Sequence, residues 1–298
     1  MRIIRSIPEM QKISGALKRK GVTIGFVPTM GALHEGHLSL IRQSRKENDI
    51  TIVSIFVNPI QFGPQEDLKN YPRYFKKDVF LCQKEKVDFI FYPQANRMYP
   101  ENFKTSVEVK ELGKVLCGVS RPNHFCGVTT VVTKLFNIVQ PAAAYFGQKD
   151  AQQATIIRRM VDDLNMPLKI KVMATVRDPD GLALSSRNIY LNRQERQDSL
   201  VLSKALGLAR EMIRHGQRNA FSIIARMKAL ISSKRSAKID YIAIVDSQTL
   251  KPVNTVKGNC LITLAVRFGK TRLIDNLKTG KKIGDRSHLF SRVRSSAK

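Results

Sequence analysis

Apolar runs alternate with amphipathic stretches along most of the first 176 residues. Short apolar runs are typical of buried strands, whereas apolar residues that recur every three or four positions indicate one face of a helix. Residues 22–27 form such a run, and Leu38 and Ile41 begin the apolar face of the helix after it. The full pattern predicts strands at residues 22–27, 50–57, 88–92 and 142–146, and helices at residues 37–48, 75–86, 128–139 and 151–164.

The order of these elements predicts how the strands pair. Because each strand is followed by a helix, neighbouring strands pair in parallel through right-handed crossovers. The expected fold is therefore α/β, with a Rossmann-like doubly wound parallel sheet in a domain of residues 1–176.

The pattern changes after residue 176. Asn192 and Glu195 have the spacing of a capping box, and Gly216 is a typical helix terminator. These residues and the apolar pattern predict helices at residues 193–215 and 220–233 and strands at residues 239–245 and 260–268. We expect a smaller α+β domain at residues 177–280. The polar, turn-rich segment at its start leads to the hypothesis that this domain acts as a lid.

Composition places the chain among ordinary globular proteins. It has 298 residues, of which 43% are hydrophobic, and this length suggests two domains. No apolar run reaches the roughly 18 to 20 residues of a membrane span, and the first residues lack the apolar core of a signal peptide. We therefore expect a cytoplasmic protein without membrane contacts.

Lysine and arginine outnumber the acidic residues by 51 to 24, which gives a formal net charge of +27. Nucleic-acid binders usually concentrate such charge on one face and add aromatic residues for stacking. Here the excess is spread along the chain and tryptophan is absent, so we expect no specific nucleic-acid partner. The one clearly basic block lies near the C-terminus, where residues 281–298 are expected to form a flexible tail. The diffuse charge would still steer ATP or acidic metabolites toward a site.

The four cysteines are scattered and form no C-x-x-C pair. Reduced thiols without a ligand are the expected state in a cytosolic protein. No cysteine stands in a context that marks a nucleophile.

Polar clusters follow three of the predicted strands, at residues 28–37, 58–61 and 147–150. In doubly wound sheets, ligands bind beyond the carboxyl ends of the strands, where the strand order reverses. We therefore expect these clusters to converge in space.

The first cluster, PTMGALHEGH, joins a strand to the start of a helix. A helix start offers backbone N–H groups and a positive dipole end, and Gly31 and Gly36 allow a ligand to approach closely. His34 and His37 could alternatively ligate zinc, but their spacing is shorter than that of the metalloprotease motif and further ligands are needed. A third reading is that both imidazoles only bond to the backbone of a turn. For a pair placed directly after a strand, we favour contact with a nucleotide phosphate.

Further segments complete a family pattern that runs from the N-terminus to about residue 277. They are residues 28–37, FVNPIQFG at 56–63, YPR at 71–73, HFCGV at 124–128, FGQKD at 146–150 with Gln153, and LSSRN at 184–188. In these segments the chain resembles the pantothenate synthetases, which are pantoate:β-alanine ligases of the HIGH-motif nucleotidyltransferase group.

The resemblance implies a two-step ligation. The pantoate carboxylate attacks the α-phosphorus of ATP to give pantoyl adenylate and pyrophosphate, and β-alanine then displaces AMP to give pantothenate. It also implies Mg²⁺ bound through the phosphates and a homodimer.

The family's site residues transfer to matching positions here. Catalytic roles fall on His34, His37, Lys149 and Arg187, with His37 as the proton donor. Pantoate contacts fall on Gln61 and Gln153, and Asn58 joins them in the substrate site. No residue is assigned as a metal ligand. The expected ATP contacts are Met30, Gly31, Ala32, Leu33, His34, Glu35, Gly36, His37, Gly147, Gln148, Lys149, Asp150, Val176, Leu184, Ser185, Ser186 and Arg187.

The residue types suit this chemistry on their own. A carboxylate with a pKa near 4 is ionised at neutral pH, so the first step needs positioning and charge stabilisation more than a base. Imidazole, lysine, arginine and serine donors supply that stabilisation. Each cluster also has a plainer interpretation: Asp150 with Gln153 as a capping box, Asn58 with Pro59 as a turn, and residues 185–187 as a loop.

Two other functions remain open at this point. Another HIGH-type adenylyl or cytidylyl transferase would share both histidines but act on a different acceptor. A basic RNA-binding protein would bind with a steep salt dependence. Gln148 and Leu184 stand where the family often has Glu and Met, and we expect these two departures to shift the ATP contacts modestly.

Overall fold

The computed structural model describes residues 1–64 and 66–280, so the expected tail at 281–298 lies outside the described residues. The chain divides into two compact units. The first comprises residues 1–114, 121–147 and 153–173, and the second comprises residues 115–120, 148–152 and 174–280. Among the described residues, no helix combines the length and hydropathy that a membrane span requires.

The first unit is built on a parallel sheet. Its strands are β1 (Arg2–Ile4), β2 (Ile24–Thr29), β3 (Ile50–Ile55), β4 (Phe89–Phe91), β5 (Ala143–Gly147) and β6 (Lys169–Met173). Their order is β1-β4-β3-β2-β5-β6. From β2 the chain builds outward to β3 and β4 and then returns to the other side of β2 with β5. The order therefore reverses between β2 and β5, and the predicted doubly wound parallel sheet is confirmed.

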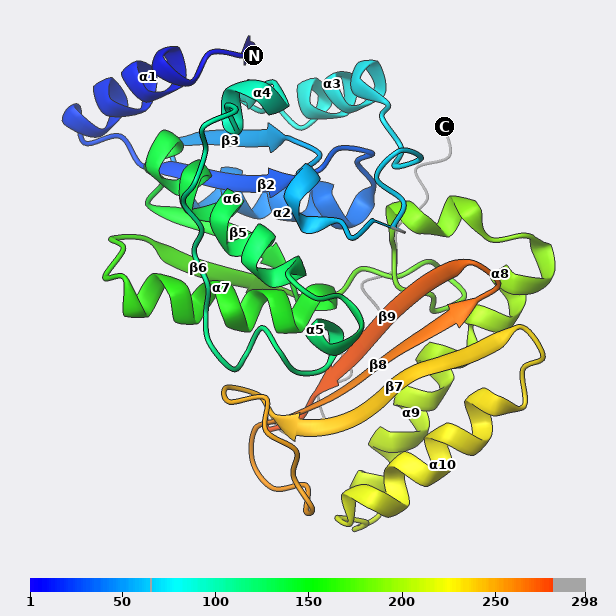
Figure 1. Cartoon of the computed structure of the whole chain (residues 1–298). Helices are drawn as coiled ribbons and strands as arrows, with labels where there is room; N and C mark the ends of the chain where they lie inside the picture. The colour runs from blue at the N-terminus through cyan, green and yellow to red at the C-terminus, as the bar shows by residue number, and fades with distance from the viewer. Residues whose placement is uncertain (65, 281–298) are drawn as a thin grey trace. The chain divides into compact units, whose positions relative to one another are not determined.

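Helices cover both faces of this sheet (Figure 1). They are α1 (Ile7–Arg19), α2 (Glu35–Glu47), α3 (Phe75–Lys84), α4 (Ala95–Met98), α6 (His124–Val139) and α7 (Ala151–Asp163), with a short 3₁₀ turn at Pro59–Gln61.

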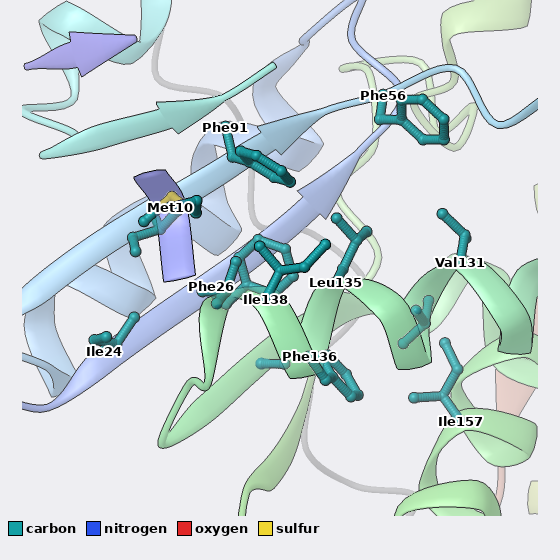
Figure 2. Packing of buried hydrophobic residues seen from close by; sticks show 14 of the residues in the cluster. Met10, Ile24, Phe26, Phe56, Phe91, Val131, Leu135, Phe136, Ile138 and Ile157 are labelled. Carbon is teal, nitrogen blue, oxygen red and sulfur yellow. The ribbon is translucent and has the colours of Figure 1, made fainter. Parts of the chain in front are cut away.

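Successive side chains of β2 enter two different cores, because strand side chains alternate between faces. Ile24 and Phe26 pack with residues of α1, α6 and α7, among them Phe136 and Ile157 (Figure 2). Val27 points to the opposite face and packs with residues of α2 and α3. The central strand is thus held rigidly from both sides, which fixes the position of the turn that follows it.

The second unit is an α+β structure. Its antiparallel sheet has the order β7 (Ala237–Asp246), β8 (Cys260–Phe268) and β9 (Thr271–Lys278). Its helices are α5 (Cys117–Ser120), α8 (Arg193–Ser199), α9 (Val201–Arg214) and α10 (Ala220–Ser232), and 3₁₀ turns lie at Gln148–Asp150 and Ser186–Tyr190. Apolar residues of α9 and α10 form one core with the sheet.

The predicted helix at residues 193–215 is wrong in one respect, since the structure breaks it at Leu200 into α8 and α9. Its start is confirmed, because Asn192 Oδ1 accepts a hydrogen bond from the Glu195 backbone at 2.9 Å and Glu195 Oε2 accepts one from the Asn192 backbone at 3.0 Å. The apolar pattern continues through the break, which is why the sequence did not reveal it. Elements that the sequence analysis missed are β1, α1, α4, α5, β6 and β9.

Candidate active site

The turn after β2 is held by a buried carboxylate from a distant helix. Gly31 and Ala32 have φ values of 84° and 50°, so the backbone enters the left-handed region that glycine tolerates best. Asp78 of α3 accepts hydrogen bonds from the backbone N–H groups of Ala32 and Leu33, at 2.9 and 2.8 Å. Asp78 is only 1% exposed. The turn therefore depends on a residue more than forty positions away in the chain.

This carboxylate changes the expected role of the turn. The backbone N–H groups of Ala32 and Leu33 point at a protein anion, and that of Gly31 donates to Thr29 Oγ1. Burial raises the pKa of Asp78, although its two N–H bonds act in the opposite direction. The backbone N–H groups of residues 31–33 are therefore already engaged within the protein.

His34 and His37 form a capping box at the start of α2. His34 Nδ1 accepts from the Gly36 backbone at 3.1 Å, and His37 Nδ1 accepts from the His34 backbone at 3.4 Å. The rings lie side by side, with centroids 4.1 Å apart. Because each Nδ1 acts as an acceptor, the proton of each neutral imidazole resides on Nε2. Both residues therefore present an Nε2–H donor, which is the form that suits a phosphate oxygen.

An oriented amide lies beside this turn. Gln61 follows β3, is 8% exposed, and donates from Nε2 to Met30 Sδ at 3.2 Å. A thioether is a weak acceptor, so a substrate oxygen would be a stronger partner for this amide. The clusters after β2 and β3 thus meet in space, as their places at the ends of neighbouring strands predict.

Asn58 fixes which way the Gln61 amide faces. Asn58 Nδ2 donates to Gln61 Oε1 and to the Gly127 carbonyl, both at 3.0 Å, while Tyr99 donates to Asn58 Oδ1 at 2.8 Å. Asn58 is 1% exposed, and burial keeps the pKa of Tyr99 well above its ordinary value. With Gln61 Oε1 engaged by Asn58, its NH₂ group faces Met30.

Gly127 allows α6 to approach the turn that carries Gln61. A Cβ at this position would lie 2.5 Å from the Ile60 carbonyl oxygen and 2.7 Å from Gln61 Cα. Both neighbours are backbone atoms, so neither can move aside cheaply. The Gly127 carbonyl reaches Asn58 only because the helix comes this close.

Glu35 and Gln153 are two further predicted site residues of the first unit. The Glu35 carboxylate pairs with Arg42 on the next turns of α2, and Arg42 also pairs with Glu85. Gln153 lies half-buried in the first turn of α7. Their assignments as ATP and pantoate contacts stay predictions.

In the second unit, the segment Gln148–Asp150 is attached to β9. Gln148 Nε2 donates to Asn276 Oδ1, and Asn276 Nδ2 donates to the carbonyls of Gln148 and Lys149, each at 2.9 Å. The Lys149 side chain is 19% exposed, and its Nζ lies 3.8 Å from Asp150 Oδ2. The hydrogen bonds from Asn276 thereby fix the backbone at Gln148 and Lys149, whereas the ammonium group of Lys149 makes a longer ion-pair contact, to Asp150.

A buried ion pair joins β9 to Arg177, in the segment that leads to residues 185–187. Arg177 forms two hydrogen bonds to Asp275, at 2.6 and 2.8 Å, and a third to the Gly181 carbonyl at 3.1 Å. Leu184 bonds back to the Val176 carbonyl at 3.0 Å, which closes a narrow hairpin. Ser185 then caps the 3₁₀ turn by accepting from the Arg187 backbone at 3.3 Å. Within this unit, β9 thus supports both the Lys149 segment and the Ser185–Arg187 segment.

The described residues include the four cysteines of the chain. All four are free thiols, and burial raises the pKa of Cys82 to about 12. Across residues 1–64 and 66–280, no group of three or more His, Cys, Asp or Glu side chains is placed to hold a metal ion.

Comparison with known proteins assigns the family. The Pantoate-beta-alanine ligase family profile matches residues 2–278. The chain belongs to the pantoate-β-alanine ligase family. The pantothenate synthetase of Caldicellulosiruptor bescii is 56% identical over 277 residues, which cover 93% of this chain and 98% of that protein. The pantothenate synthetase of Pseudothermotoga lettingae is 53% identical over 281 residues, covering 94% and 100%.

Solved structures agree with this assignment to the pantoate-β-alanine ligases. A crystal structure of pantothenate synthetase from Thermus thermophilus has a TM-score of 0.89 at 43% identity and covers 93% of this chain and 99% of that one. A pantoate-β-alanine ligase from Francisella tularensis, complexed with β,γ-ATP and β-alanine, has a TM-score of 0.78 at 39% identity and covers 94% and 99%. The family resemblance inferred from the motifs is confirmed.

Several supporting residues escaped the sequence analysis. Asp78, Asn276 and the Arg177–Asp275 pair contact predicted site segments in the structure but carry no recognisable motif. A polar or charged residue within an amphipathic pattern is ordinarily predicted to be exposed to solvent. The sequence therefore did not indicate that these side chains are buried. His124 lies within a motif segment and Tyr99 lies outside all of them, and nothing in the sequence assigned partners to either residue.

Proposed function

We propose that this chain condenses pantoate with β-alanine at the expense of ATP, through pantoyl adenylate, and releases AMP and pyrophosphate. One observation carries the proposal: in a chain of the pantoate-β-alanine ligase family, the oriented Gln61 amide lies directly against Met30 of the two-histidine turn. An amide donor that recognises an acid and imidazole donors that suit a phosphate thus occur side by side.

Hydrogen-bond donors and cations perform the first step in this proposal. The ionised pantoate carboxylate attacks the α-phosphorus, and negative charge moves toward the leaving pyrophosphate. His34 and His37 donate from Nε2 to phosphate oxygens, Lys149 and Arg187 neutralise charge, and Ser185 and Ser186 add hydroxyl donors. The remaining predicted ATP contacts, from Met30 to Gly36 and at Gly147, Gln148, Asp150, Val176 and Leu184, shape the nucleotide site.

Gln61 and Gln153 hold pantoate in this proposal. An amide NH₂ group donates to the carboxylate, and an amide oxygen accepts from a hydroxyl. The observed contacts give Asn58 the task of orienting Gln61 from within the protein. In the second step the β-alanine nitrogen attacks the acyl carbon, AMP departs, and the amine proton passes to solvent or to an adenylate oxygen.

Magnesium is proposed as a partner of the ATP phosphates. In this proposal the phosphate oxygens hold the ion, because Mg²⁺ prefers oxygen ligands and commonly binds through substrate phosphates. When bound, it would supply charge neutralisation. A homodimer and a cytoplasmic location are further proposals that rest on the family resemblance; sedimentation equilibrium tests the first.

Mass spectrometry of a reaction containing ATP, magnesium, pantoate and β-alanine tests the proposed function. We expect pantothenate and AMP in equal amounts. Without β-alanine, pyrophosphate release should still require pantoate. Release that is indifferent to pantoate but depends on another acceptor would instead support a different HIGH-type transferase and overturn the proposal.

A further inference from the structure

His124 lies at the start of α6 and contacts both Gln61, which follows β3, and Arg121. It is 8% exposed. Its Nδ1 lies 2.8 Å from the main-chain oxygen of Gln61, and its Nε2 lies 3.0 Å from Arg121 Nη1. Arg121 in turn forms two hydrogen bonds to Glu66, at 2.8 and 2.5 Å. A continuous chain of contacts therefore runs from Glu66 through Arg121 and His124 to Gln61.

The partners of His124 determine its tautomer. An arginine side chain has only donors, so Nε2 facing Arg121 must act as an acceptor. A carbonyl oxygen can only accept, so Nδ1 facing Gln61 must carry the proton. This is the opposite tautomer to that of His34 and His37, whose Nδ1 atoms accept backbone hydrogen bonds. The difference arises from the neighbours, because all three side chains are the same.

The bond to Gln61 acts on the backbone of a residue whose side chain is already oriented. Asn58 sets which way the Gln61 amide faces, but the position of the amide also depends on where its main chain sits. The 3₁₀ turn that carries Gln61 spans only Pro59–Gln61. Its two backbone hydrogen bonds are long: 3.5 Å from the Gln61 nitrogen to the Asn58 carbonyl oxygen, and 3.4 Å from the Phe62 nitrogen to the Pro59 carbonyl oxygen. The 2.8 Å bond from His124 is shorter than either.

We propose that His124, in the Nδ1–H form imposed by Arg121, is a positioning residue that holds the Gln61 main chain where its amide meets pantoate. This inference rests on the proposed function and on the pantoate role of Gln61. His124 acts through Gln61 and makes no contact with a reacting atom in this proposal.

Two substitutions distinguish the role of Nδ1 from that of Nε2, because each removes only one of the two hydrogen bonds. His124→Asn places an amide NH₂ near the position of Nδ1 and keeps the donor to Gln61, but it loses the acceptor for Arg121. His124→Gln places an amide oxygen near the position of Nε2 and keeps that acceptor, but it loses the donor to Gln61. Glutamine also retains more of the buried side-chain volume than asparagine does. If His124 only filled space, His124→Asn would therefore be the more damaging substitution.

Steady-state kinetics with varied pantoate and varied ATP then test the proposal. We expect His124→Gln to raise KM for pantoate about tenfold, the factor that matches one hydrogen bond of about 1.4 kcal/mol. His124→Asn should stay close to wild type, and KM for ATP should change little in either variant. Equal effects on pantoate, or a larger effect in His124→Asn, overturn the proposal.

The tautomer can be read without any activity. Long-range ¹H–¹⁵N spectra of the full chain without substrate should show His124 protonated at Nδ1 and His34 and His37 protonated at Nε2. An inactive wild type with this spectrum means that the proposed function has failed while the contact chain stands. An active wild type with His124 protonated at Nε2 means that the inference itself is wrong.

Discussion

The two units support their predicted site residues by different means. In the first unit, the direct partners of the predicted site residues are mostly neutral: Asp78 binds uncharged backbone N–H groups, imidazoles and amides orient one another, and the Arg121–Glu66 ion pair acts through His124. In the second unit, charge dominates: Asp275 is bonded to Arg177, and the predicted ATP residues include Lys149 and Arg187. The first arrangement is directional and insensitive to salt, whereas the second is strong only where it is buried.

In the proposed function, this difference separates directional donors from fixed cations. Neutral hydrogen bonds depend on exact donor and acceptor positions, so they suit the discrimination of a hydroxy acid. Fixed cations act over longer distances and suit a triphosphate. Variants of both units test this contrast.

The largest effect should come from the buried ion pair. Arg177→Met leaves Asp275 without its cation in a site where Asp275 is 1% exposed, and breaking such a pair costs about 3 to 5 kcal/mol. Urea unfolding, with hydrogen exchange of β8 amides as the reporter of the second unit, measures the loss. The double variant Arg177→Met with Asp275→Asn should recover much of it, because no charge remains buried. A loss below about 1 kcal/mol in the single variant would show that the pair is dispensable.

His37→Ala should reduce turnover about 100-fold, since an oriented donor to developing charge contributes roughly 3 kcal/mol. KM for pantoate should change much less, because the residue is assigned to phosphate. Single-turnover formation of the adenylate isolates this step. The defect should be the same in low and high salt. An unchanged rate would remove the assigned role of His37.

Asp78→Asn should destabilise the turn by about 1 kcal/mol near neutral pH, because one backbone N–H then faces an amide NH₂ group. The effect depends on pH. Burial raises the pKa of Asp78 in the folded protein above its ordinary value of 3.8, so the folded state binds this proton more tightly than the unfolded chain. The contribution of Asp78 to stability is therefore greatest below pH 3.8 and declines as pH rises through the raised pKa.

Urea unfolding at a series of pH values checks the direction of this effect. The stability of wild type relative to Asp78→Asn should fall from pH 3.8 upward and level off once the raised pKa is passed. Asp163→Asn removes an exposed carboxylate and serves as the charge-matched control, for which a much smaller trend is expected. A trend of opposite sign would mean that the two N–H bonds outweigh the burial of Asp78.

The smallest effect concerns Lys149. Lys149→Met should raise KM for ATP about fivefold at low ionic strength, and the defect should shrink as salt is added, because screening weakens the interaction that the variant lacks. Lys169→Met removes an exposed lysine at the start of β6 and provides the control for net charge. A defect that is independent of salt would place Lys149 with the directional donors of the first unit.

The sequence predicted the elements whose pattern is strongly periodic or wholly apolar. Strands β2, β3 and β5 and helices α2 and α7 lie within a few residues of the expected bounds, because their cores require continuous apolar runs. Strand β9 was missed because it buries Asp275 and Asn276 among its apolar residues, which destroys a simple alternation. Strand β6 has no fully buried residue and carries lysines at its first and third positions, so it resembled a loop.

The site could be predicted only as far as its motifs extend. The meeting of Met30 with Gln61 follows from strand ends that share one edge of a parallel sheet. The bonds between Asp78 and the backbone of Ala32 and Leu33, and between His124 and Gln61, do not follow from any local pattern, because each joins residues more than forty positions apart. The orientation of the Gln61 amide likewise required the positions of Asn58, Tyr99 and Gly127 together.

The absence of a side chain at Gly127 bears on attempts to redesign this enzyme. Helix α6 meets the Gln61 turn backbone to backbone, so even one added methyl group at this contact would displace the Gln61 amide. Libraries aimed at accepting other organic acids should therefore leave residue 127 untouched. Variation belongs in the neighbouring side chains. These can change the shape of the site for a new acid without disturbing the backbone contact between α6 and the Gln61 turn.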